Sequence, residues 1–125
     1  MFDVNFYRTV LPERVKAECH SRPGQVPVVQ LYLATGRELD LCHIVHLADT
    51  WLAVQYFRDA ESCEDMDTAF LPYELVAMVT VSLYHPERRR LGFKIDADPA
   101  RSESEAPSPL GATQGQLGRA QRSIT

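Results

Sequence analysis

The spacing of apolar residues changes once along the chain, and this change separates a helix from a run of strands. In residues 11–20 the apolar positions Leu11, Val15 and Cys19 recur every four residues, which is the spacing of one helix face. A Pro-Gly pair at positions 23–24 then interrupts the pattern. The sequence therefore predicts one short N-terminal helix.

From residue 26 onward the apolar positions recur every second residue, as in half-buried strands. Runs of β-branched and aromatic residues bounded by turn residues predict five strands, at 26–34, 37–47, 51–58, 68–71 and 75–84. A tight turn, one turn of 3₁₀ helix, is expected at 72–74. Residues 87–95 fit either a helical turn or a sixth strand. In the second strand, alternation places one set of side chains on a single face: Leu39, Leu41, His43, Val45 and Leu47.

These elements predict a mainly β domain. Five short antiparallel strands within about 60 residues are too few for a sandwich, but they can form a small, strongly bent barrel that hides most of its edges. The domain is expected to span residues 1–96. Residues 97–125 are rich in Ser, Pro, Gly and Gln and contain no aromatic residue, so this tail is expected to be disordered.

The composition narrows the class of protein further. Of the 125 residues, 45% are hydrophobic and 24% are charged, as in soluble globular domains. We expect neither a membrane span nor a signal peptide, because no apolar run is long enough and the N-terminus lacks a basic start. Three cysteines, an odd number, argue against a disulfide framework. A reducing, cytoplasmic location is therefore predicted.

The formal net charge of −4 hides an uneven distribution. Residues 26–82 contain two arginines against nine carboxylates, whereas the segments on either side carry a small positive excess. A polyanion such as RNA could therefore dock only on these basic flanks. The candidate binding residues are six cations and one aromatic side chain that could stack on a base: Arg14, Lys16, Arg22, Arg88, Arg89, Arg90 and Tyr73.

No pattern in the chain predicts catalysis, a metal or a cofactor. Cys42, His43 and His46 do not share one face of a strand at ligand distance. The acidic run at 59–67 lacks the spacing and the glycine of a calcium-binding loop. Known nucleotide-binding and hydrolase motifs are absent from the sequence as well. We therefore expect a protein that is not an enzyme.

The order of elements resembles the Sm-like (Sm, LSm and Hfq) family. The resemblance lies in LYLATGREL for a first hairpin, HIVHLADTWLAV around Asp49 for a second turn, and AFLPYELVAMVTV for the last two strands. It covers roughly residues 10–82 and implies a helix followed by a five-stranded Sm-like or SH3-like barrel. In the family, strands four and five pair with neighbouring subunits and form rings. The Hfq type binds uridine through a Tyr-Lys-His run in the last turn, but here that turn reads Leu71-Pro72-Tyr73, so the site is not carried over.

Two functions are left open by the sequence. The first is a non-enzymatic Sm-like binding module that forms a homo-oligomeric ring and binds a partner through a ring face, with RNA as the partner that the resemblance implies. The second is a protein-interaction or regulatory adaptor that binds no nucleic acid and uses the acidic loop or strand aromatics.

Overall fold

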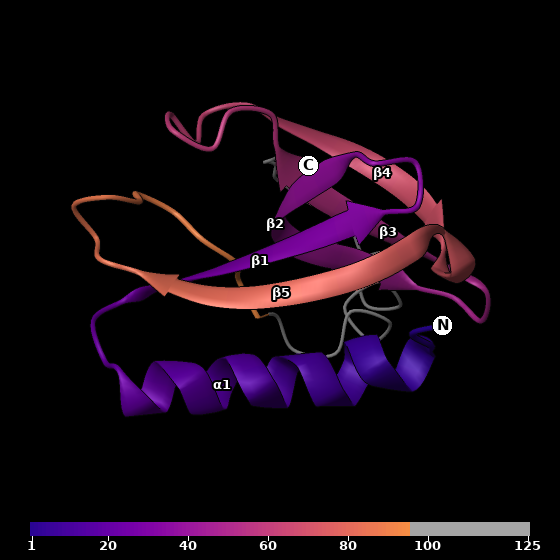
Figure 1. Ribbon diagram of the computed structural model, residues 1–125, viewed down its shortest axis with the longest axis horizontal. Coiled ribbons are helices and arrows are strands. Elements are labelled where there is room, and N and C mark those ends of the chain that lie inside the picture. The colour runs from indigo at the N-terminus through magenta and orange to yellow at the C-terminus, as the bar shows by residue number, and fades with distance from the viewer. Residues whose placement is uncertain (96–125) are drawn as a thin grey trace, which may run out of the picture.

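The computed structural model describes residues 1–95, which form one helical segment followed by a five-stranded sheet (Figure 1). The α-helix α1 covers Leu11–Ser21, close to the predicted range. A turn of π-helix, Phe6–Val10, precedes it and was not anticipated from the sequence. The predicted tail at 97–125 lies outside the described residues. No helix among the described residues is long and apolar enough to cross a membrane.

All five predicted strands are present. Their bounds are Val26–Leu33 for β1, Glu38–Leu47 for β2, Trp51–Phe57 for β3, Met66–Pro72 for β4 and Val76–Tyr84 for β5. A 3₁₀ turn, η2, covers Tyr73–Leu75 between the last two strands. The prediction of a mainly β fold with an N-terminal helix and five antiparallel strands is thus confirmed.

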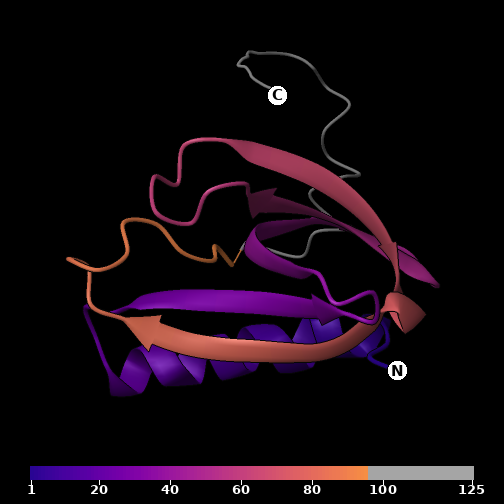
Figure 2. The same ribbon diagram turned by 45° about the horizontal axis from the view of Figure 1, so that its top comes forward.

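The strands are ordered β4-β3-β2-β1-β5, and every neighbouring pair is antiparallel. The sheet is barrel-like but stays open, because β5 pairs with β1 along its length and the pairings within the described residues do not join it to β4. The expectation that a barrel would hide the edges is therefore not met, and β4 and β5 form the two edges. Helix α1 lies along β1 and β5 (Figures 1 and 2).

The predicted alternation in β2 is wrong at His43 and Val45, which do not join the main core, and holds again at Leu47. The main core takes Leu39, Leu41, Ile44 and Leu47 from this strand, rather than every second residue. Register shifts occur between Leu41 and His43 and between Ile44 and His46 on the side that faces β3. Each bulge adds one residue and moves the following side chains to the opposite face.

The segment after β5 is neither a helix nor a sixth strand. It turns at 86–88 and then crosses the sheet as irregular chain. The backbone N–H of Phe93 donates to the carbonyl of Pro27 at 2.8 Å, and that of Lys94 to the carbonyl of Cys42 at 2.7 Å. Since the ladder between β1 and β2 covers only Val29–Tyr32 of β1, this segment fills the split where the two strands separate. We call residues 89–95 the C-terminal clasp.

Candidate functional site

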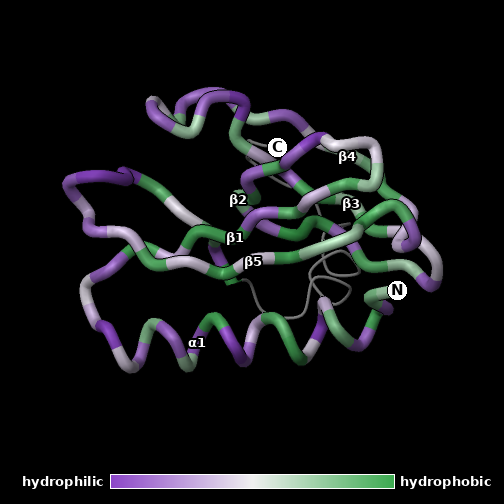
Figure 3. Tube along the Cα trace, in the orientation of Figure 1, coloured by the Kyte–Doolittle hydropathy of each residue, from purple (hydrophilic) through white to green (hydrophobic). Residues whose placement is uncertain are grey.

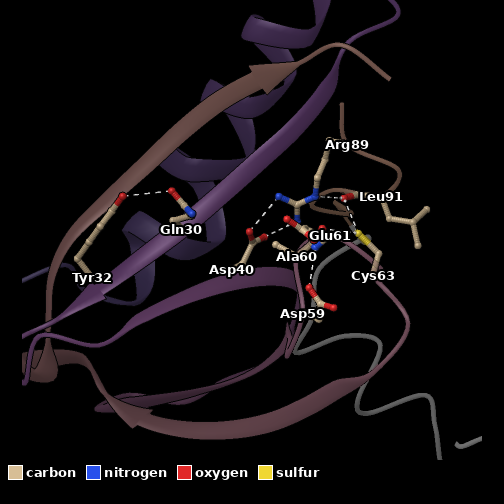
Figure 4. A network of polar contacts seen from close by, with 9 residues as sticks. All are labelled: Gln30, Tyr32, Asp40, Asp59, Ala60, Glu61, Cys63, Arg89 and Leu91. Atoms are coloured by element: carbon tan, nitrogen blue, oxygen red, sulfur yellow. Dashed lines mark hydrogen bonds and ion pairs between the residues drawn. The ribbon is translucent and has the colours of Figure 1, made fainter. Parts of the chain in front are cut away.

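The three predicted arginines that follow β5 have three different environments. Arg88 is exposed, and Arg90 is exposed but donates from Nη2 to the carbonyl of Ser62 at 2.6 Å. Arg89 is only 6% exposed and grips the Asp40 carboxylate with both terminal nitrogens, at 2.9 and 2.6 Å (Figure 4). Arg89 is therefore a buried structural residue and is not available to a polyanion.

The ion pair between Arg89 and Asp40 holds the clasp on the sheet. The Arg89 guanidinium lies 5.4 Å from the ring centre of Phe57, and its Nε donates to the carbonyl of Leu91 at 2.8 Å. Burial alone would lower the pKa of Arg89, but the hydrogen bonds and the charge of Asp40 outweigh it and raise that pKa. The guanidinium thus stays charged inside the protein, where a bidentate carboxylate partner is the arrangement that makes this tolerable.

The loop between β3 and β4 packs beneath the clasp. Cys63, with a φ of 57°, is buried against Phe57 and Cys42, and its thiol lies 3.2 Å from the carbonyl of Ala60 (Figure 4). The carboxylate-bearing residues of this loop point outward and are exposed: Asp59, Glu61, Glu64 and Asp65. We call residues 59–65 the acidic loop.

The other predicted cations lie on α1 and just beyond it. Arg14 lies 3.6 Å from a carboxylate oxygen of Glu18, and Lys16 lies 3.9 Å from one of Glu13. Arg22 caps the end of the helix and is exposed. Two of these three charges are thus compensated on the same helix, which lowers the potential that this face offers to a polyanion.

Tyr73, the predicted stacking residue, is in the core. It is 1% exposed, its ring stacks on that of Tyr7 with centres 5.4 Å apart, and its hydroxyl donates to the carbonyl of Ala48. Burial raises the pKa values of Tyr73 and of Tyr7, because it disfavours the charged phenolate. A buried ring that already has a stacking partner cannot take a base, so Tyr73 is not a binding residue.

An aromatic group lies on the outer face of β2, β3 and β4, and the sequence did not show that its members come together. The ring centre of Trp51 lies 5.3 Å from that of His46 and 6.1 Å from that of Phe70. Together with Val45 and Ala53 these side chains line a shallow hollow of about 250 Å³. Phe70 is 65% exposed, although it sits in an otherwise apolar run. Its outward direction depends on the register of β4, with Leu71 turned into the core, and a run of four apolar letters does not specify that.

The two edge strands carry very little charge. β5 has no charged residue in nine positions, and the single charge of β4, Asp67, is 3.2 Å from Arg58. Figure 3 shows β5 in green and pale tones, whereas the acidic loop and the start of the segment after β5 are purple. A second hollow of about 250 Å³ lies along β5 and is lined by Phe6, Val10, Leu11, Arg14, Val79 and Val81. Edge strands of monomeric proteins normally carry charges or prolines that prevent pairing with another chain.

The described residues contain no metal centre, and the chain matches no known family. Residues 1–95 contain no group of three or more potential metal ligands. Comparisons of the chain with protein-family models, with curated proteins and with solved structures find no match. The evidence for a function therefore lies in the open strand edges, the two hollows and the charge distribution of this chain.

Proposed function

We propose that this protein is a non-enzymatic module that self-associates through its two open edges, β4 of one copy pairing with β5 of the next. The observation that carries the proposal is β5, a nine-residue edge strand without a charge. Its unpaired backbone groups are a template for another strand. Met78, on the outer face of this edge, is 48% exposed.

Apolar surface flanks both edges and favours the same pairing. On the β5 side, the hollow between α1 and the strand is lined by Val79 and Val81. On the β4 side, Phe70 projects from the outer face beside Trp51. A strand added at either edge would cover these side chains, and burial of apolar area is the main favourable term in association.

The arrangement supports a ring as the form of the assembly. Because β4 and β5 lie at opposite edges, each copy would use two different surfaces, and such head-to-tail contacts close into a ring when the rotation between copies allows it. The resemblance to the Sm-like family implies the same use of strands four and five. The ring would then present repeated faces to a partner.

The resemblance to the Sm-like family implies RNA as the partner. Few exposed arginine and lysine side chains are available to bind it. Of the seven predicted binding residues, Arg89 and Tyr73 are buried. Binding of a polyanion would depend on the remaining exposed cations, Arg22 and Arg88 foremost, and would weaken steeply with salt.

A protein partner is the second candidate, and the hollow formed by His46, Trp51 and Phe70 favours it. Aromatic side chains around a shallow apolar hollow are the kind of anchor found at the centre of protein interfaces. The exposed carboxylate of Asp49 beside Trp51 would repel a nucleic-acid backbone and would tolerate a basic peptide.

The experiment is sedimentation equilibrium of the full chain from about 1 to 100 µM, with two matched lysine variants. Thr80 on β5 and Gln30 on β1 are cross-strand neighbours, and both are half-buried. Thr80→Lys places a charge on the open edge, while Gln30→Lys places the same charge one strand further in. We expect the wild type and Gln30→Lys to form the same oligomer, and Thr80→Lys to need about tenfold higher concentration, which corresponds to about 1.4 kcal/mol. A wild-type chain that stays at 14.1 kDa throughout would contradict the proposal.

A further inference from the structure

Charged residues lie next to the ends of both edge strands, where an interface between two copies would bring them together. The acidic loop directly precedes β4, and the turn at 85–88, which carries the exposed Arg88 next to the exposed Glu87, directly follows β5. When two strands pair in antiparallel fashion, the start of one lies beside the end of the other. Pairing of β4 with β5 of a second copy therefore brings the acidic loop of one copy to the end of the next where the turn with Arg88 lies.

The register of such a pair is restricted by the faces of the two strands. Ala69 and Leu71 of β4, and Val79 and Val81 of β5, all contact the main core, so these positions must remain on the same side of the joined sheet. Only two registers satisfy this and also pair all seven residues of β4. In these registers Met66 lies opposite Ser82 or Tyr84 of the second copy.

Both registers bring Arg88 of the second copy close to the acidic loop. Arg88 follows Tyr84 by four residues, so it lies about 13 Å of extended chain beyond the strand end, or nearer because the chain turns at 86–88. In the first copy, Glu64 and Asp65 lie just before the start of β4 at Met66, at the same end of the joined sheet as Arg88 of the second copy. The contact requires the Arg88 side chain to extend toward the free edge of β5, because the backbone beyond the turn runs the other way, toward β1 and β2.

The charges involved are uncompensated in a single copy. Arg88 is exposed, and residues 1–95 provide it with no ion pair. The same holds for the exposed carboxylates of Glu64 and Asp65 within the described chain. Arg90 contacts the acidic loop of its own copy through the carbonyl of Ser62, which holds the loop in place and leaves those carboxylates unpaired. Figures 1 and 2 show the loop and the segment after β5 at the same end of the sheet.

We infer that Arg88 of one copy pairs with Glu64 and Asp65 of the next, and that this contact aligns the edge pairing and makes it sensitive to salt. The inference rests on the proposed self-association and names its electrostatic part. It assigns Arg88 to a contact between copies of this chain rather than to a polyanion. Such exposed charge pairs add modest affinity, but they select the correct register and speed encounter.

The test is a charge swap, with oligomer dissociation measured by sedimentation equilibrium at about 50 and 500 mM NaCl. We expect Arg88→Glu and Glu64→Arg each to raise the dissociation constant about tenfold at low salt, because each replaces an attraction by a repulsion. The double variant, Arg88→Glu with Glu64→Arg, should return to within about threefold of the wild type. Lys16→Glu, on the exposed face of α1, makes the same change in net charge as Arg88→Glu and serves as the control.

The outcomes separate this inference from the proposed function. Wild-type assembly that weakens with salt, together with rescue in the double variant, supports the pairing of Arg88 with Glu64. If Arg88→Glu assembles as well as Lys16→Glu, the pairing is wrong while self-association stands. If both single variants dissociate and the double variant is not rescued, these two residues are not partners. A monomeric wild type at both salt concentrations overturns the inference and the proposed function together.

Discussion

The sheet has unpaired strand segments in two places, the split between β1 and β2 and the outer edges of β4 and β5. Within the described chain, only the split is covered. In the split, the clasp supplies hydrogen bonds to Pro27 and Cys42, a buried ion pair and the apolar side chain of Phe93. At the outer edges, the described chain offers neither a covering segment nor a protective charge on β5. The contrast indicates that the split is closed within one copy, and that the edges are suited to closure by another copy.

The largest effect is expected from removing the carboxylate that holds the clasp. Asp40→Ala leaves the Arg89 guanidinium buried without its partner, which should lower the free energy of unfolding by about 3–5 kcal/mol. Asp67→Ala breaks the exposed ion pair with Arg58 and should cost less than about 1 kcal/mol. Urea denaturation of both variants measures the difference. Equal costs would show that the clasp is no more important than a surface contact.

A smaller effect is expected where the clasp passes closest to β1. A Cβ atom at Gly92 would overlap the carbonyl oxygen of Pro27, so Gly92→Ala must push the clasp away from the strand. We expect a loss of about 2–3 kcal/mol in thermal or urea denaturation. At Gly36, with a φ of 97° and open space around it, the same substitution should cost about 1 kcal/mol, from backbone conformation alone. A Gly92→Ala protein as stable as Gly36→Ala would contradict this close contact.

The sequence predicted the elements of this fold well and the fate of individual side chains less well. Local periodicity was sufficient for α1 and for the strands, because each pattern lies within about ten residues. Arg89 meets Asp40 across 49 positions of the chain, and Tyr73 is covered by Tyr7 from the N-terminal segment. The three consecutive arginines at 88–90 cannot be distinguished in the sequence. Their different environments are set by contacts that only the tertiary structure creates. β2 contains no glycine or proline, so its sequence held no signal for the two bulges.

Because of the buried tyrosines, the free energy of unfolding of each copy should fall at alkaline pH. Tyr7 and Tyr73 ionise with a pKa near 10.0 when unfolded, and burial raises both values in the folded protein. Their contribution is therefore fully present below about pH 10 and is lost as the pH rises above it, by up to about 1.4 kcal/mol per pH unit for each residue. Urea denaturation at pH 9 and pH 11 should show this loss, and Tyr7→Phe should reduce it. A Tyr7→Phe variant with an unchanged pH dependence would exclude Tyr7 as a source.

The smallest effect on the stability of one copy is expected at the open edges. Thr80→Lys lies on a strand edge that pairs with no other strand of residues 1–95, so its free energy of unfolding at low micromolar concentration should change by less than about 0.5 kcal/mol. Chemical denaturation at that concentration tests this. A large loss would mean that the variant disrupts the fold rather than the assembly, and its effect on assembly would then need Thr68→Lys on β4 as a second probe.

Residue-resolved hydrogen exchange as a function of concentration is the sharpest test of pairing between β4 of one copy and β5 of another. The amides of Phe93 and Lys94, bonded to Pro27 and Cys42 within one copy, serve as an internal standard that should be protected at every concentration. We expect outward-facing amides of β4 and β5 to become protected at about 100 µM and to exchange freely at about 1 µM. If those edge amides exchange freely at both concentrations while Phe93 and Lys94 stay protected, the edges are not paired and self-association through them is wrong.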